Sequence, residues 1–120
     1  MRPVDLIWAG GEHGFALDIG GLRAVQDSTN RGPMEIYAAL GSGTWRIDDV
    51  LAVLRFGLIG GGMAPGEAKA LMVRIVDVTP IGKLVATAHL VIAAALVGPA
   101  DDPVGGSAGE PAGAAAPPAA

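Results

Sequence analysis

The stretch IDDVLAVLRFGLIGGG, Ile47–Gly62, decides the fold class that we predict for this chain. Its aliphatic residues recur at the three- and four-residue spacing of an amphipathic helix, at Ile47, Val50, Leu51, Leu54 and Leu58. Two aspartates near the start suit the positive end of the helix dipole, and the closing glycines provide the free backbone that a helix end needs. The stretch therefore predicts a helix whose apolar face must be covered by neighbouring elements.

Two further helices are predicted downstream of this stretch. The first begins at Pro65, because proline suits a first helical position, and closes at Thr79-Pro80. Its expected buried stripe is Ala68, Leu71, Met72, Ile75 and Thr79. The second runs from about Ile81 to Val97 and is apolar on two sides. One side holds Leu84, Val85, Ala88, Val91, Ile92, Ala95 and Leu96, and the other holds Leu90, Ala94 and Val97. Such a helix is either buried on all sides or available to a partner.

Two shorter helices are predicted upstream. The first follows the strand break at Gly20-Gly21 and is stopped by Asn30-Arg31-Gly32. The second begins at Pro33 and ends at Gly41-Ser42-Gly43. Its apolar side consists of Ile36, Tyr37 and Leu40.

The N-terminal segment predicts a β-hairpin from about Val4 to Ile19. Apolar residues alternate with period two on both sides of a glycine-rich turn, Gly10–Gly14, and they are Val4, Leu6 and Trp8, then Phe15, Leu17 and Ile19. A lone hairpin is only marginally stable, so helices must cover it. The predicted fold class is α+β and mainly α, with the N-terminal hairpin packed on a bundle of about four or five short helices.

The composition favours one folded domain followed by a tail. The chain has 120 residues, of which 51% are hydrophobic, 4% aromatic and 17% charged, which is enough apolar material for one core. Ala, Pro and Gly make up 17 of the 22 residues from Pro99 to Ala120. Such a segment cannot repay the entropy of ordering itself. We therefore predict a folded domain over residues 1–98 and an Ala/Pro/Gly-rich disordered tail over residues 99–120.

The charge balance and the absence of cysteine exclude several classes of function. The net charge is −4, and three acidic residues lie in the tail, at Asp101, Asp102 and Glu110. A nearly neutral domain with an acidic tail argues against binding to phosphates by counterion release, so no nucleic-acid partner is expected. Disulfides, thiolate metal sites and a cysteine nucleophile are ruled out because the chain has no cysteine.

One segment has to be considered as a membrane span. Leu84–Ala100 is 17 residues long, contains polar Thr87 and His89, and ends in glycine and proline. A spanning helix needs about 20 predominantly apolar residues, so a buried or partner-binding helix is the better interpretation. No apolar run typical of a signal peptide opens the chain, and we expect a cytoplasmic protein without a membrane partner.

The polar residues do not combine into a recognisable active site. The glycine-rich stretch Gly57–Pro65 follows a predicted helix and lacks phosphate-loop spacing, so we interpret it as a connector. His13 is expected on a solvated turn and His89 on a half-buried helix face, too few ligands for zinc. Asp48 and Asp49 are explained by helix capping. We expect no catalytic residue, no cofactor and no metal site, and hence no enzyme.

Three blocks of sequence resemble a known family when taken in order. They are GEHGFALDIGGLRAVQ (Gly11–Gln26), GTWRIDDV (Gly43–Val50) and RFGLIGGGMAPGEA (Arg55–Ala68). Together they are similar to the gene transfer agent family of phage tail assembly proteins, over about Leu6 to Gly98. The strongest block is the glycine triplet framed by GLI and by M-A-P-x-E-A.

The resemblance implies that residues 1–98 form a domain like those of tail assembly chaperones. Such a protein is encoded in a prophage or gene transfer agent and coats the tape-measure protein until tail-tube subunits replace it. Descriptions of the family also use the label of tail-tube protein, so a structural tail-tube component of the particle is the alternative. A small membrane-associated protein is a third, more distant reading. The implied partners are the tape-measure protein and the tail-tube protein, and we also expect a homo-oligomer.

A set of apolar residues is the candidate partner surface. We predict that the second side of the last helix, Leu90, Ala94 and Val97, contacts a partner or a second copy of the chain. Met63 and Met72 could add adaptable contacts because methionine is flexible and polarizable. Trp45, between two predicted helices, is either packed in the core or an exposed anchor.

Overall fold

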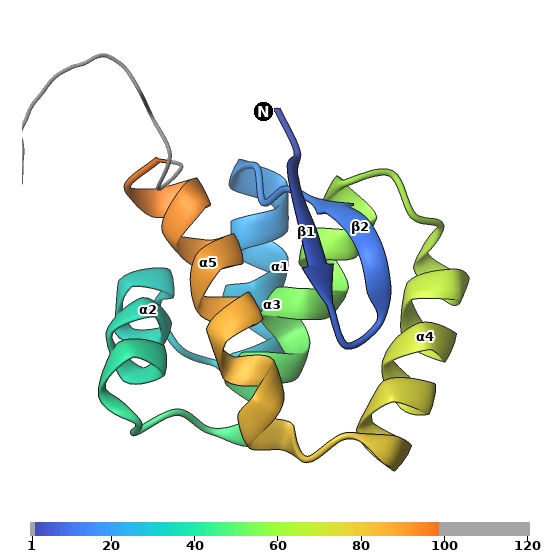
Figure 1. Cartoon of the computed structure of the whole chain (residues 1–120). Helices are drawn as coiled ribbons and strands as arrows, with labels where there is room; N and C mark the ends of the chain where they lie inside the picture. Colours follow the sequence, from blue (N-terminus) through green and yellow to red (C-terminus); the bar gives the residue numbers. More distant parts are fainter. Residues whose placement is uncertain (1, 99–120) are drawn as a thin grey trace, which may run out of the picture.

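A short hairpin and five α-helices make up the computed structural model, which describes residues 2–98 (Figure 1). The elements are β1 (Val4–Trp8), β2 (Gly11–Phe15), α1 (Ile19–Thr29), α2 (Pro33–Ser42), α3 (Ile47–Gly60), α4 (Pro65–Val78), the 3-10 turn η1 (Ile81–Leu84) and α5 (Val85–Leu96). This arrangement confirms the predicted fold class. The predicted tail, residues 99–120, lies outside the described residues.

The hairpin is tighter than its sequence pattern suggested. β1 and β2 pair antiparallel from Val4 opposite Phe15 to Trp8 opposite Gly11, so Ala9 and Gly10 alone form the loop. The prediction that Gly10–Gly14 is a turn was therefore wrong, because Glu12, His13 and Gly14 belong to β2. The indole Nε1–H of Trp8 donates to Nδ1 of His13 at 2.9 Å, which holds this histidine in the hairpin rather than on a solvated turn.

The first helix begins earlier than predicted. Asp18 is its N-cap, and the carboxylate accepts a hydrogen bond from the backbone N–H of Gly21 at 2.8 Å. The cap draws Gly20 and Gly21 into the helix, although glycines usually disfavour helix interiors. Ile19 is consequently the first residue of α1 and is exposed, instead of ending the hairpin face.

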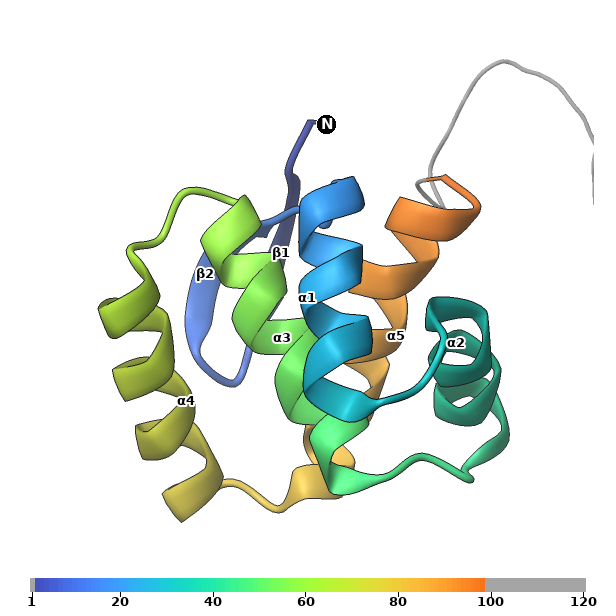
Figure 2. The ribbon, with the colours of Figure 1, turned by 180° about the vertical axis from the view of Figure 1, so that it is seen from behind.

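Helix α3 lies at the centre of the molecule. It packs against α1, α4, α5 and β2, and Figure 2 shows it between α1 and α4. The predicted stripe is buried along most of its length, at Val50, Leu54 and Leu58, whereas Ile47 at the helix start is exposed. The core around α3 also takes in Phe15, Leu17, Val25, Ile36, Ala68, Ile75, Leu84 and Ile92.

The end of α3 is pressed against the β2–α1 connection. The backbone N–H of Ala16 donates to the carbonyl of Gly57 at 3.0 Å. A side chain at Gly60 would overlap the carbonyl oxygen of Ala16, and one at Gly61 would overlap the carbonyl oxygen of Gly14. The glycine-rich stretch is thus a helix end and connector whose glycines allow two backbones to touch.

A buried ion pair joins the α1–α2 connection to the start of α3. Nη1 of Arg31 lies 2.6 Å from Oδ2 of Asp49, whose side chain is fully buried. The same oxygen accepts the backbone N–H of Arg46 at 2.8 Å, so Asp49 also acts in the capping box of α3. Capping therefore explains Asp49 in part, as predicted, but its ion pair with Arg31 was not foreseen.

The last helix is shorter than predicted and largely enclosed. Ile81–Leu84 wind as the 3-10 turn η1, a common form of a helix start, before α5 begins at Val85. α5 packs against α2, α3 and β1. The rings of Tyr37 and His89 stack with centroids 5.1 Å apart, which ties α2 to α5.

Candidate partner-binding surfaces

The predicted partner face of the last helix is only partly accessible. Leu90 and Val97 are 44% and 63% exposed, whereas Ala94 is buried. Burial follows from the packing of α5 against α2 and α3, which encloses that side of the helix. A single continuous face of Leu90, Ala94 and Val97 is therefore not presented to solvent.

The other predicted partner residues come from parts of the chain other than α5. Trp45 is half-buried in the α2–α3 connection and packs against the core. Met63, in the α3–α4 connection, is half-buried in the same way, and Met72 on α4 is buried. All three are buried or half-buried against the core, unlike the exposed Leu90 and Val97, and their role in binding stays a prediction.

The clearest excess of exposed apolar side chains is on α4. Val73, Val76 and Val78 are 60%, 40% and 80% exposed. They flank the stripe of Ala68, Met72 and Ile75 that buries the other side of the helix. Sequence reasoning missed them because it followed the buried stripe alone. The spacing of Val73 and Val76 on the remaining side was the signal that could have identified this surface.

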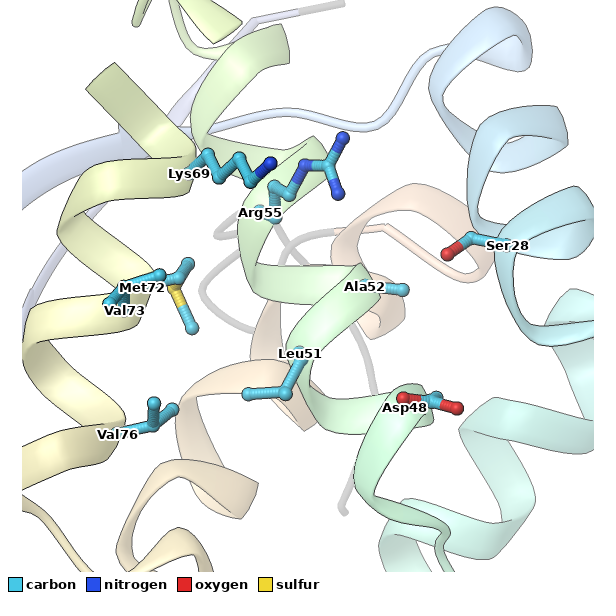
Figure 3. A pocket seen from close by; sticks show the side chains of 9 residues that line it. All are labelled: Ser28, Asp48, Leu51, Ala52, Arg55, Lys69, Met72, Val73 and Val76. Atoms are coloured by element: carbon cyan, nitrogen blue, oxygen red, sulfur yellow. The ribbon is translucent and has the colours of Figure 1, made fainter. Parts of the chain in front are cut away.

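A groove separates α4 from α3, with α1 along its margin (Figure 3). We call it the α3–α4 groove. Its volume is about 240 Å³. The lining is mainly apolar in the middle and polar at the ends, and comprises Ser28, Asp48, Leu51, Ala52, Arg55, Lys69, Met72, Val73 and Val76.

Charge is unevenly distributed along this groove. Figure 3 shows Arg55 and Lys69 at one end and Asp48 toward the other. The guanidinium carbon of Arg55 lies 4.8 Å from the ring centroid of Phe56, which is a cation–π contact. Within residues 2–98, the buried Nε of Arg55 has no hydrogen-bond acceptor. This end of the groove therefore carries two cationic side chains, Arg55 and Lys69.

A second groove lies between α4 and the hairpin, and we call it the hairpin-side groove. Its volume is about 380 Å³, and it is lined by His13, Met63, Glu67, Ala70, Leu71 and Arg74. His13 faces it while accepting the hydrogen bond from Trp8. Nowhere in the described part of the chain do three or more His, Cys, Asp or Glu side chains gather as metal ligands would.

Comparison with known families shows which protein family the chain belongs to. A sequence model of the family described as "Phage tail tube protein, GTA-gp10" matches residues 3–98. The chain belongs to this family. The match covers every helix and strand of the structure, from β1 to α5. A search of curated proteins and a search of solved structures each found no match.

Membership of the GTA-gp10 family confirms the resemblance to gene transfer agent proteins. The family description names a phage tail tube protein, which is closer to the structural alternative than to an assembly chaperone. Among the described residues, no helix is long and apolar enough to cross a membrane. A role in the phage tail thus replaces the broader set of functions that the composition had left open.

Proposed function

We propose that this GTA-gp10 family protein is a non-catalytic structural component of the tail tube in a phage or gene transfer agent particle. The observation that carries the proposal is the family match over the whole described domain rather than over one motif. Three residues of types that often serve in catalysis make contacts within the fold. His13 accepts from Trp8, His89 stacks on Tyr37, and Asp49 pairs with Arg31.

Purified particles are expected to contain the chain in amounts comparable to other tail proteins. A subunit built into a tube must be present in many copies, because closed rings and helical arrays repeat one interface. Quantitative mass spectrometry of purified particles, with a capsid protein as internal reference, measures the ratio. Absence from particles, together with abundance in the lysate of the producing cells, would contradict a tube role.

A second candidate is an assembly chaperone that binds the tape-measure protein. The observation in its favour is apolar surface that the domain leaves uncovered, including Leu90 and Val97 on and just after α5. Transient partners of helical segments use such surface, since it can be covered and released. In this role the chain would be bound to the tape-measure protein before assembly and missing from the finished particle.

For the chaperone role, the double variant Leu90→Lys/Val97→Lys is expected to reduce co-purification with the tape-measure protein by roughly tenfold or more. Both side chains are exposed, so lysine should leave the domain folded. Ile47→Lys is the matched control, because Ile47 is 58% exposed and lies at the start of α3. Equal recovery of the tape-measure protein with the wild-type chain and with the double variant would argue against this surface.

A further inference from the structure

The outward side of α4 carries a stripe that the rest of the domain does not cover. Lys69, Val73, Val76 and Asp77 are spaced by three, four and eight residues, which places them on one side of an α-helix. All four are exposed. Ala70, on the edge of the same side, is small and lets another backbone approach closely. We call Lys69, Val73, Val76 and Asp77 the α4 stripe.

Packing leaves this stripe open because α4 is attached to the body from one direction. It packs mainly against α3, and the hairpin loop at Gly10 approaches Ile75 on its inner side. Figure 2 shows α4 at the edge of the molecule, beyond α3. Val73 and Val76 therefore form both one wall of the α3–α4 groove and part of the outer surface of the helix.

The charge pattern of the α4 stripe is self-complementary when two copies of the helix pair antiparallel. Lys69 lies four residues before Val73, and Asp77 lies four residues after it. When two such helices pair antiparallel with a two-fold axis at Val73, Lys69 of each copy faces Asp77 of the other. The two Val73 side chains then meet at the centre, and Val76 of one copy meets Ala70 of the other.

The charges that line the α3–α4 groove are also consistent with this antiparallel pairing. An antiparallel helix brings its Asp77 to the cationic end, where Arg55 and Lys69 line the groove (Figure 3). There the carboxylate would meet two positive charges, those of Arg55 and Lys69. Opposite charges near a partly buried surface attract more strongly than in open water.

We propose that α4 of a second copy docks antiparallel along the α4 stripe and the α3–α4 groove, forming a two-fold symmetric dimer. A second copy is the favoured occupant because one helix supplies both halves of the charge pattern and the apolar centre. The inference is independent of the proposed function, since it depends on α4 and its groove alone. Its failure would leave the particle composition test unaffected.

Charge reversal tests the pairing directly. Lys69→Glu and Asp77→Lys are each expected to raise the dimer dissociation constant by roughly tenfold or more, because each places like charges opposite each other twice. The double variant Lys69→Glu/Asp77→Lys restores opposite charges between the two helices but leaves a lysine near Arg55, so it is expected to recover part of the lost affinity. Sedimentation equilibrium of the full chain over a concentration series measures the constants, and circular dichroism checks the fold.

Arg74→Glu is the matched control for Lys69→Glu. It makes the same change of charge on the same helix, but Arg74 lines the hairpin-side groove instead of the α3–α4 groove. The dimer dissociation constant of the Arg74→Glu variant should equal that of the wild type. The inference is overturned by a wild-type chain that stays monomeric throughout the series, by single variants that dimerise normally, or by a double variant that dimerises no better than either single variant.

Zero-length cross-linking with a carbodiimide gives an independent readout. The reagent joins an amine to a carboxylate only when they are in contact, and Lys69 is one of two lysines in the chain. Lys69 and Asp77 of one helix are about 12 Å apart along its axis, too far for such a link. A cross-linked peptide joining Lys69 to Asp77 in the dimer band is expected. A dimer band whose links all avoid α4 would contradict the proposed interface.

Discussion

The Gly60→Ala variant is expected to lose about 3 kcal/mol or more of its free energy of unfolding. The added methyl group would overlap the carbonyl oxygen of Ala16, a backbone atom that cannot rotate away. Ala16 is held in place by its own hydrogen bond to Gly57 and by the strand that precedes it. Domains of this size have about 5–15 kcal/mol of stability in total, so the variant should be largely destabilised.

Urea unfolding followed by circular dichroism measures this effect. Gly61→Ala should behave similarly, because its methyl group would overlap the carbonyl oxygen of Gly14. Gly82→Ala is the control, since a methyl group there meets open space and should change stability by less than about 0.5 kcal/mol. A Gly60→Ala midpoint equal to that of Gly82→Ala would show that the α3 end can move away from the hairpin.

The Arg31→Met variant is expected to be destabilised by about 3–5 kcal/mol. The side chain of Asp49 is fully buried, and Arg31 supplies its compensating charge at 2.6 Å. Without the guanidinium, the carboxylate keeps only the backbone N–H of Arg46 at Oδ2, while its Oδ1 has no partner within residues 2–98. A buried and uncompensated charge is among the costliest defects of a protein interior.

Two companion variants separate the buried pair from the surface contact that Arg31 also makes. Glu35 lies 3.2 Å from Nε of Arg31 but is 61% exposed, so Glu35→Gln should cost less than about 1 kcal/mol. The double variant Arg31→Met/Asp49→Leu removes both charges and should recover much of the lost stability. Chemical denaturation provides all three values. Equal losses for Arg31→Met and Glu35→Gln would refute a dominant role for the buried pair.

Local signals in the sequence accounted for most of the helix boundaries. Pro33 and Pro65 mark the first residues of α2 and α4, and Gly43 adopts the left-handed conformation that ends α2. These signals act within one helical turn, so they can be recognised without knowing the tertiary structure. The Arg31–Asp49 pair spans 18 residues and has no comparable local signature.

The hairpin and the first helix show where local interpretation failed. The Gly10–Gly14 segment is rich in glycine, and a longer turn was the natural reading, but pairing with β1 extends β2 across it. The cap at Asp18 similarly outweighs the helix-breaking tendency of Gly20 and Gly21. In both places a specific interaction prevailed over the average preference of the residue type.

The exposed apolar side chains of α4 were not foreseen from the sequence, for a physical reason. α5 is the more apolar helix, but α2, α3 and β1 enclose much of it. α4 looks ordinary in sequence, yet it packs mainly against α3 and leaves Val73 and Val76 accessible. How much apolar surface a helix exposes depends on how many neighbours cover it, which periodicity does not reveal.

The packing of β1, the first element, against α5, the last, has a consequence for synthesis on the ribosome. β1 packs against α5, and β2 packs against α3. The hairpin emerges first but is only marginally stable by itself, so it gains a lasting partner when α3 appears. The core closes only after α5 has been translated. A nascent chain stalled before Val85 would therefore present an open apolar interior to the proteases and chaperones of the cell.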